Sequence, residues 1–258
     1  MTAVKPKKKS VRLWAVVFWL LVWQGASMAL AVLYPHGALL LASPLSALAR
    51  LGELAVTAAF WRTALTSAAR ILGGFLLACA LAVVLAALAA RYRRAEELLA
   101  PLVSVVKAVP VASFIVISLI WLSAANISVF ISFLMVLPIL YTNVLNGMKS
   151  APRELLERAS LFRVPSPRRL LLVYLPALRP YLLSGCGVAI GLAWKAGVAA
   201  EIIGIPEGSI GEKFYFAKVY FATGDLFAWT AAVVCISVLF EKLFLFLLGR
   251  FYARLEKL

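Results

Sequence analysis

Acidic and metal-binding side chains are scarce in this sequence. Asp and Glu together number 11, against 26 Lys and Arg, and His36 is the single histidine. His, Cys and carboxylate residues do not gather in any loop, which argues against an integral-membrane enzyme. The phosphate-binding pattern G-x-x-x-x-G-K-[ST] is also absent, so the sequence offers no means of hydrolysing ATP. We therefore expect no catalytic residue, no metal site and no cofactor bound by this chain.

Cysteine is nearly as rare. The three cysteines, Cys79, Cys186 and Cys235, all lie in apolar stretches. They have neither the spacing typical of metal ligands nor the loop positions that favour disulfides, so we interpret them as small packing residues.

Apolar side chains make up most of what is present. The chain is 64% hydrophobic and 14% charged, with a mean hydropathy of +0.98, which is too apolar for a soluble globule. A net charge of +15 could indicate nucleic acid, but the basic residues separate apolar runs and do not form a polar domain. We expect a membrane protein that contacts lipid and binds no nucleic acid.

Long runs without charge predict the membrane spans. A helix needs about 20 apolar residues to cross a bilayer, and continuous runs of this kind satisfy the backbone in lipid only as helices. The longest run is divided by a polar break at 123–126. Six spans follow: 13–33, 71–90, the two halves of 108–148, 182–203 and 226–248. The predicted fold class is all-α, one polytopic membrane domain over residues 1–258.

The basic residues predict the orientation, because cytoplasmic loops retain Lys and Arg. Most of them fall in the segments 5–12, 91–94, 149–179 and 250–257, which the six spans place on one side. Both termini and the loop 149–179 should therefore be cytoplasmic. The shorter, amphipathic segment 44–62 should lie at the outer surface.

The inner loop 149–179 contains a predicted short helix. Pro152 suits a first turn and Pro165 should end the helix, which gives bounds from Pro152 to Val164. Helical spacing places four apolar residues on one face. They are Leu155, Leu156, Ala159 and Phe162. Periodicity alone is also compatible with an ordinary helix at the membrane surface.

The spacing of this loop resembles the coupling loop of permeases in binding-protein-dependent ATP-binding-cassette (ABC) importers. Their pattern is E-A-A, three residues, Gly, nine residues, Ile, one residue, Leu-Pro. Here Glu157 opens the pattern, Val173 stands in place of Ile, and Leu175 and Pro176 complete it. Arg158 replaces the middle Ala. Arg163 replaces the Gly, which removes the residue best suited to a positive-φ helix end.

Other pieces of the chain extend the resemblance to nearly its whole length. ELLERASLF at 154–162, KAVPVAS at 107–113 and AEIIG at 200–204 are similar to permeases for nitrate, sulfonates, taurine, bicarbonate and thiamine-precursor pyrimidines. The resemblance implies a type I ABC importer permease fold in the bacterial inner membrane. It also implies import of a small polar or anionic solute.

The resemblance implies partners as well. These are a cytosolic ABC ATPase dimer that holds ATP and Mg, an extracytoplasmic substrate-binding protein and a second copy of the chain. The residues expected to couple to the ATPase are Glu154, Leu155, Leu156, Glu157, Ala159, Phe162, Arg163, Leu175 and Pro176.

Charges inside the predicted spans need a reason, because an ionisable residue at membrane depth is costly. Lys107 and Lys242 lie close to span ends, where snorkelling explains them. Lys195 lies past the midplane, either lining the path of the solute or in a buried structural pair. Glu201 is expected at the outer rim or in a gate.

Gly187 and Gly191 of the fifth span form a G-x-x-x-G pattern. Close packing of helices is its usual meaning, and an approach of two subunits near the path is the alternative. The rival function is a secondary transporter driven by an ion gradient. That class favours paired carboxylates at the midplane of two related halves, whereas Glu201 stands alone and the halves are not visibly alike.

Overall fold

The computed structural model describes residues 12–255, and helices are the only regular secondary structure within that range. The helices are α1 (Leu13–Leu33), α2 (Gly37–Leu40), α3 (Pro44–Ala55), α4 (Ala58–Arg91), α5 (Arg93–Ala108), α6 (Val111–Ser118), α7 (Ala124–Lys149), α8 (Arg153–Leu161), α9 (Ser166–Arg169), the π-helical turn η1 (Leu170–Tyr174), α10 (Leu175–Gly204), α11 (Ile210–Val219) and α12 (Thr223–Leu255).

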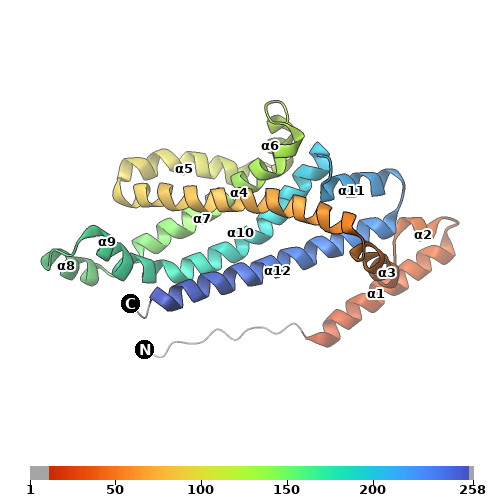
Figure 1. The fold of residues 1–258 in the computed structure, drawn as a ribbon, viewed down its shortest axis with the longest axis horizontal. Coiled ribbons are helices and arrows are strands. Elements are labelled where there is room, and N and C mark those ends of the chain that lie inside the picture. The colour runs from red at the N-terminus through yellow and green to blue at the C-terminus, as the bar shows by residue number, and fades with distance from the viewer. Residues whose placement is uncertain (1–11, 256–258) are drawn as a thin grey trace.

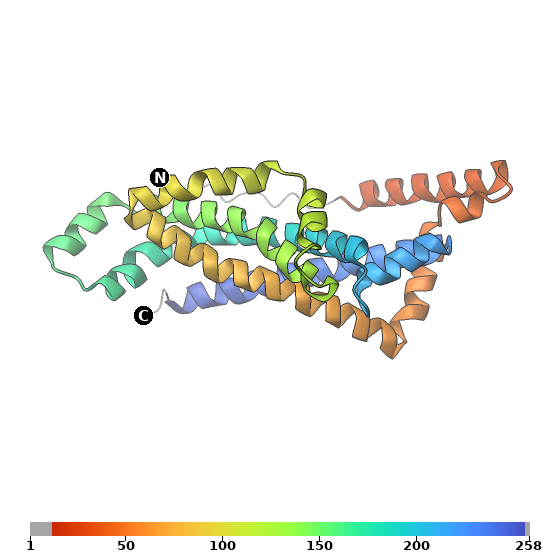
Figure 2. The same ribbon diagram turned by 90° about the horizontal axis from the view of Figure 1, so that it is seen from above.

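The long helices lie side by side along the long axis of the molecule (Figure 1). At one end, here named the α8 end, α8 and α9 project beyond the bundle. The opposite end, named the α11 end, carries α2, α3 and α11. Figure 2 shows the same elongated bundle from above, with α8 and α9 at one extreme and α1 and α2 at the other.

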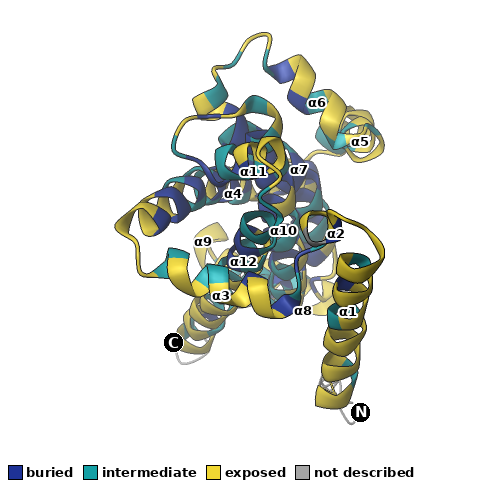
Figure 3. Ribbon diagram, turned by 90° about the vertical axis from the view of Figure 1, so that its right-hand side faces the viewer, coloured by how far each residue is buried: buried dark blue, intermediate teal, exposed yellow. Residues whose placement is uncertain are grey.

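Small residues bring the three central helices, α4, α7 and α10, close together. Close backbone approach is a main source of helix packing in lipid, where apolar burial gives no driving force. A methyl group at Gly74 of α4 would lie 2.2 Å from the Val129 carbonyl oxygen of α7. The α4 side chains buried in this core include Ala78, Ala82, Ala86 and Ala89. The view from the α11 end shows α10 near the centre and α1 mostly exposed (Figure 3).

The helices confirm an all-α protein with about six spans. Five are long and apolar enough to cross a membrane: α1, α4, α7, the continuous helix from Ser166 to Gly204, and α12. The pair α5 and α6 adds a sixth if it is counted as one broken span.

Two predicted boundaries are wrong. Residues 44–62 are not one surface segment, because α3 ends at Ala55 and α4 already begins at Ala58. The oxygen of Thr57 caps α4 by accepting a hydrogen bond from the Phe60 N–H at 3.3 Å, so the chain turns sharply there.

The third span also differs from its prediction. A straight helix was expected to start near Ala108, but α5 begins at Arg93 and meets α6 at a bend of 100°. Pro110 has no N–H for a helical hydrogen bond and disfavours the helical conformation of Val109, which is extended. Hydropathy registers the apolar run but not this bend.

At the α11 end an ion-pair cluster ties α3 to α12. The Arg50 guanidinium hydrogen-bonds Asp225 at the start of α12 and also pairs with Glu53 at 2.8 Å. These hydrogen bonds, with Asp225 the larger contributor, raise the pKa of Arg50 above its usual value. Arg50 therefore stays charged and holds the surface helix against the bundle.

Candidate functional site

A single continuous helix connects α8 to the far end of the molecule. α9, η1 and α10 together form 39 residues, from Ser166 to Gly204, which at about 1.5 Å per residue is roughly 58 Å. Within η1 the helical turn is wider, because the Leu175 N–H donates to the Leu170 carbonyl five residues earlier and not four. The wider turn precedes Pro176, which has no N–H to donate. Leu175 and Pro176 thus lie where the helix changes pitch.

The end of α8 explains the spacing of the coupling pattern. The Val164 N–H donates to the Ala159 carbonyl at 2.8 Å, and the Arg163 N–H donates to the Ser160 carbonyl at 3.0 Å. This is a Schellman helix end, in which the residue after the cap takes a left-handed conformation. Arg163 does so, with φ of 49°. The pattern has Gly at this position, so Arg163 adopts the glycine geometry despite its Cβ.

The apolar residues of α8 do not form the single outward face that we predicted. Ala159 is only 8% exposed, and Leu156 is half-buried. Leu155 is exposed, and Phe162 is 76% exposed. Leu161, which the predicted apolar face did not include, is 83% exposed just before the cap.

The two carboxylates of α8 are both exposed. Glu154 in the first turn and Glu157 one turn later lie on the surface, and neither forms an ion pair with another described residue. α8 therefore offers exposed carboxylates beside the exposed apolar side chains of Leu155, Leu161 and Phe162. Such a surface suits a partner with a basic, partly apolar groove.

Glu201, predicted at the outer rim or in a gate, is buried inside the protein, and a role in a gate stays a prediction. It is 0% exposed, and its Oε2 accepts hydrogen bonds from the Ser67 hydroxyl at 2.7 Å and the Gly211 N–H at 3.3 Å. Ser67 in turn accepts from the Ile210 N–H at 2.8 Å. Arg70 of α4 interacts electrostatically with this carboxylate. The network joins α4, α10 and the first turn of α11.

Lys195 is exposed on α10, so the alternative of a buried structural pair is wrong. Lys195 forms no ion pair with the residues that the structure describes. Ser184, Val188 and Gly191 lie on the same side of α10 as Lys195. The steps from Ser184 to Lys195 are four, three and four residues, which is helical spacing. Ser184 and Val188 are exposed as well, and this row is named the α10 strip.

The two glycines of the predicted pattern do not pack closely within the chain. A methyl group at Gly191 would meet open space, and one at Gly187 would lie 3.7 Å from Glu241 Oε1 of α12. The close contacts are made elsewhere on α10. At Gly185 a methyl group would lie 2.9 Å from Asn143, and at Gly197 it would lie 2.5 Å from Ser132 Oγ. Approach of a second subunit at Gly187 and Gly191 stays a prediction.

Lys107 was predicted close to a span end, and the structure contradicts this. It lies in the last turn of α5, about 21 Å from the start of that helix at about 1.5 Å per residue. Its Nζ donates a hydrogen bond to Thr142 Oγ1 of α7 at 3.0 Å. The signal in the sequence was the basic run at 91–94, which marks the junction where α4 ends at Arg91 and α5 begins at Arg93.

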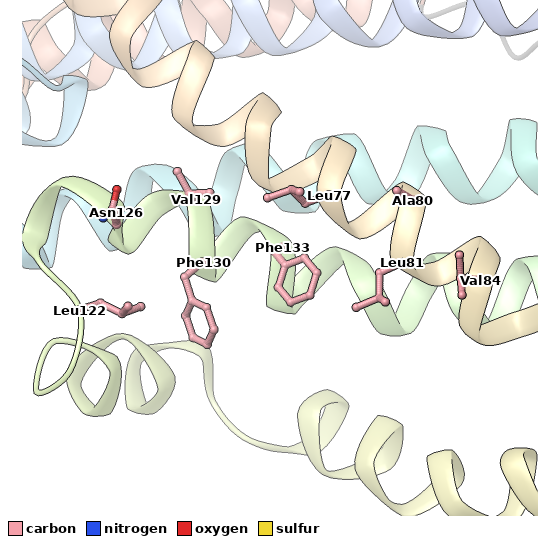
Figure 4. A pocket seen from close by; sticks show the side chains of 9 residues that line it. All are labelled: Leu77, Ala80, Leu81, Val84, Leu122, Asn126, Val129, Phe130 and Phe133. Atoms are coloured by element: carbon pink, nitrogen blue, oxygen red, sulfur yellow. The ribbon is translucent and has the colours of Figure 1, made fainter.

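Two pockets differ in chemistry. One of about 610 Å³ lies between α4 and α7, beside the turn into α7, and Asn126 is its single polar side chain (Figure 4). It suits hydrocarbon and not a polar solute. The other, of about 740 Å³, lies at the α11 end and mixes cations with carboxylates, so it favours neither sign of charge. Its charged residues are Arg62, Arg70, Glu207, Glu212 and Lys213.

Comparison with known proteins identifies the type of chain that has this architecture. The family model for the binding-protein-dependent transport system inner membrane component matches residues 82–257. A putative ABC transporter permease of Methanocaldococcus jannaschii is 31% identical over 149 residues, which are 57% of this chain and 56% of that protein.

Two relatives come from Synechococcus elongatus. Its bicarbonate transport system permease is 27% identical and its nitrate import permease 28% identical, each over 162 residues, 62% of this chain. The matched region spans 57% of the length of each of these two proteins.

Proposed function

Since the chain belongs to the family of binding-protein-dependent transport system inner membrane components, we propose that it is the permease subunit of an ATP-driven importer. It forms the path of the solute and couples to a separate ABC ATPase. Two copies of the chain and two ATPases form the core, and a substrate-binding protein delivers the solute from outside. The chain itself hydrolyses nothing and binds no cofactor.

The observation that carries this proposal is α8 and its link to the long helix. α8 projects beyond the bundle and exposes Glu154, Glu157 and Phe162 (Figure 1). Its Schellman end leads through a short loop into the helix from Ser166 to Gly204. A push on α8 by closing ATPases is therefore passed to the far end of the bundle by one element.

The orientation follows from the same assignment. If α8 docks on a cytosolic ATPase, the α8 end is cytoplasmic and the α11 end faces outward, in the inner membrane of a bacterium. The basic segments 91–94 and 149–179 support this, since they lie at the α8 end. Both termini are then cytoplasmic.

The substrate is a small polar or anionic solute. The names of the bicarbonate and nitrate relatives support an anion. The α10 strip is our candidate for the wall of the path, because Lys195 stands there without an ion-pair partner among the described residues. A water-filled path between two subunits is where such a charge is tolerated.

The test is the effect of Glu157→Lys on ATPase binding, with Glu53→Lys as its control. Both carboxylates are exposed, but Glu53 lies at the α11 end. We expect purified wild-type chain to retain two permeases and two ATPases in native mass spectrometry. Glu157→Lys should weaken ATPase retention about tenfold or more and abolish uptake, because it reverses a charge at the interface. Normal ATPase retention and uptake in Glu157→Lys would exclude α8 as the coupling element.

A further inference from the structure

Besides Lys242 of α12, two lysines in the spans, Lys107 and Lys195, have no acidic partner among the described residues. Both are exposed, and neither forms an ion pair within residues 12–255. Lys107 is held by Thr142, whose hydroxyl donates to the Pro138 carbonyl at 2.7 Å and is free to accept from an ammonium group. Neutral hydrogen bonding fixes the position of Lys107 but leaves its charge uncompensated.

Both lysines lie on the same side of the bundle, which is bordered by the α5–α6 pair and α10. Thr142 links Lys107 to α7 on the side where α5 packs. Leu192 and Ala199, one turn before and after Lys195, pack against the apolar cluster that contains Ile115 of α6. In the view from the α11 end, α5 and α6 lie together on one side of α10 (Figure 3).

The two charges stand at different depths. Asn143, next to Thr142, contacts Gly185 of α10, so Lys107 is anchored at the level of Gly185. Lys195 is ten residues further along α10, which is about 15 Å toward the α11 end at about 1.5 Å per residue. Val188, which is 62% exposed, lies between these two levels.

The carboxylates of the neighbouring helices do not neutralise this side. Glu201 is buried on another face of α10 and already accepts hydrogen bonds from Ser67 and Gly211. Glu241 of α12 lies near Gly187, with its Oε1 3.7 Å from where a methyl group at Gly187 would be. Glu96 of α5 is paired with Lys149 at the α8 end. Lys107 and Lys195 therefore stay without an ion-pair partner among the described residues.

We propose that Lys107 and Lys195 make this side of the bundle an anion path, so that the transported solute is a small anion. An unpaired ammonium group at membrane depth is tolerated when it faces water, and it attracts negative ions and repels positive ones there. Lys195 attracts the solute in the outer half and Lys107 in the inner half. This inference rests on the proposed function, because it takes the side of α10 between the helices as the path.

The test uses a thiol placed between the two lysines. The three native cysteines are replaced by Ser, Val188→Cys is introduced, and the full transporter in liposomes is treated with an anionic and a cationic methanethiosulfonate reagent. Rates are normalised to those with a free thiol. We expect a normalised preference for the anionic reagent of about fivefold, by attraction of one reagent and repulsion of the other.

Matched variants separate the lysines from other effects. Lys107→Gln and Lys195→Gln should each lower the ratio of the anionic to the cationic rate toward a value of 1. Lys→Arg at either position should keep the wild-type ratio. Lys242→Gln removes an equal charge from α12 and should change nothing, because Lys242 is on another helix. A chain that keeps only Cys235, exposed on α12, should show no preference.

Two results would overturn the anion path. Either the thiol introduced by Val188→Cys reacts equally fast with both reagents, or its preference survives both Lys→Gln changes. Absence of any reaction at that thiol would overturn it too, since the surface would then face no water. Failure of the proposed function would appear in a different measurement, as a wild-type chain that retains no ATPase. The thiol reaction does not measure ATPase retention.

Discussion

The two ends of the long helix that contains α10 are held in different ways. At the α11 end, Glu201 is fully buried and joins α4 to α11 through Ser67 and Gly211. At the α8 end, α8 is held mainly by its own helix end, and Leu161 and Phe162 lie exposed. The α11 end is thus fixed by hydrogen bonds inside the protein, whereas α8 exposes a surface suited to binding a partner.

This difference assigns different consequences to mutation. A change at the buried Glu201 should act on the stability of the permease itself. A change on α8 should leave the permease folded and act on what it binds. Buried polar groups are costly to leave unpaired, whereas exposed side chains contribute little to stability until a partner covers them.

The largest effect is expected from Glu201→Ala. It leaves the Ser67 hydroxyl and the Gly211 N–H without their acceptor inside the protein. We expect the free energy of unfolding to fall by about 3 kcal/mol. The measurement is the thermal unfolding of the purified permease in detergent.

The control for this change is Glu154→Ala on α8. Glu154 is exposed and forms no ion pair with the described residues, so its loss should alter stability by no more than about 0.5 kcal/mol. Equal unfolding temperatures for the two variants would mean that the hydrogen bonds of Glu201 do not hold the α11 end.

A smaller effect, on binding alone, is expected from Phe162→Asp. The side chain is 76% exposed, so a carboxylate there costs the isolated permease almost nothing. In the complex it would replace an aromatic anchor with a charge, and such anchors contribute about 2 kcal/mol or more. We expect the Kd for the ATPase to rise about 30-fold, measured by titration of the ATPase onto nanodisc-embedded permease.

Two results bear on that prediction. Ala159→Asp should by contrast lower the stability of the permease, since it places a carboxylate at a position that is only 8% exposed. If Phe162→Asp lowers the unfolding temperature as much as Ala159→Asp does, then Phe162 is part of the fold and not of a docking surface.

The sequence was sufficient to predict what depends on neighbouring residues. The existence of α8 and its end near Pro165 follow from local signals, and so does the number of apolar helices. The conformation of Arg163 was not predicted, because Arg in place of the pattern's Gly argued against a positive-φ helix end. In the structure Arg163 has φ of 49°.

Contacts between distant residues could not be predicted in this way. Ser67 and Glu201 are 134 residues apart, and nothing near either of them indicates the other. The 100° bend after α5 is invisible to hydropathy, since both sides of Val109 and Pro110 are apolar. Lys107 was misplaced for that reason, and its hydrogen bond to Thr142 was missed with it.

The smallest effect is expected from Arg163→Gly, which should change hydrogen exchange at the end of α8 but not around Glu201. A left-handed residue with a Cβ is less favourable than glycine by about 1 kcal/mol, so the change should stabilise the end of α8. Opening of the hydrogen bonds from Val164 to Ala159 and from Arg163 to Ser160 should become about fivefold rarer. Hydrogen exchange of peptides covering 153–165 in the full transporter measures this, with peptides around Glu201 as the internal control. Faster exchange in the α8 peptides would show that the Arg163 side chain holds the helix end through contacts that outweigh its backbone strain.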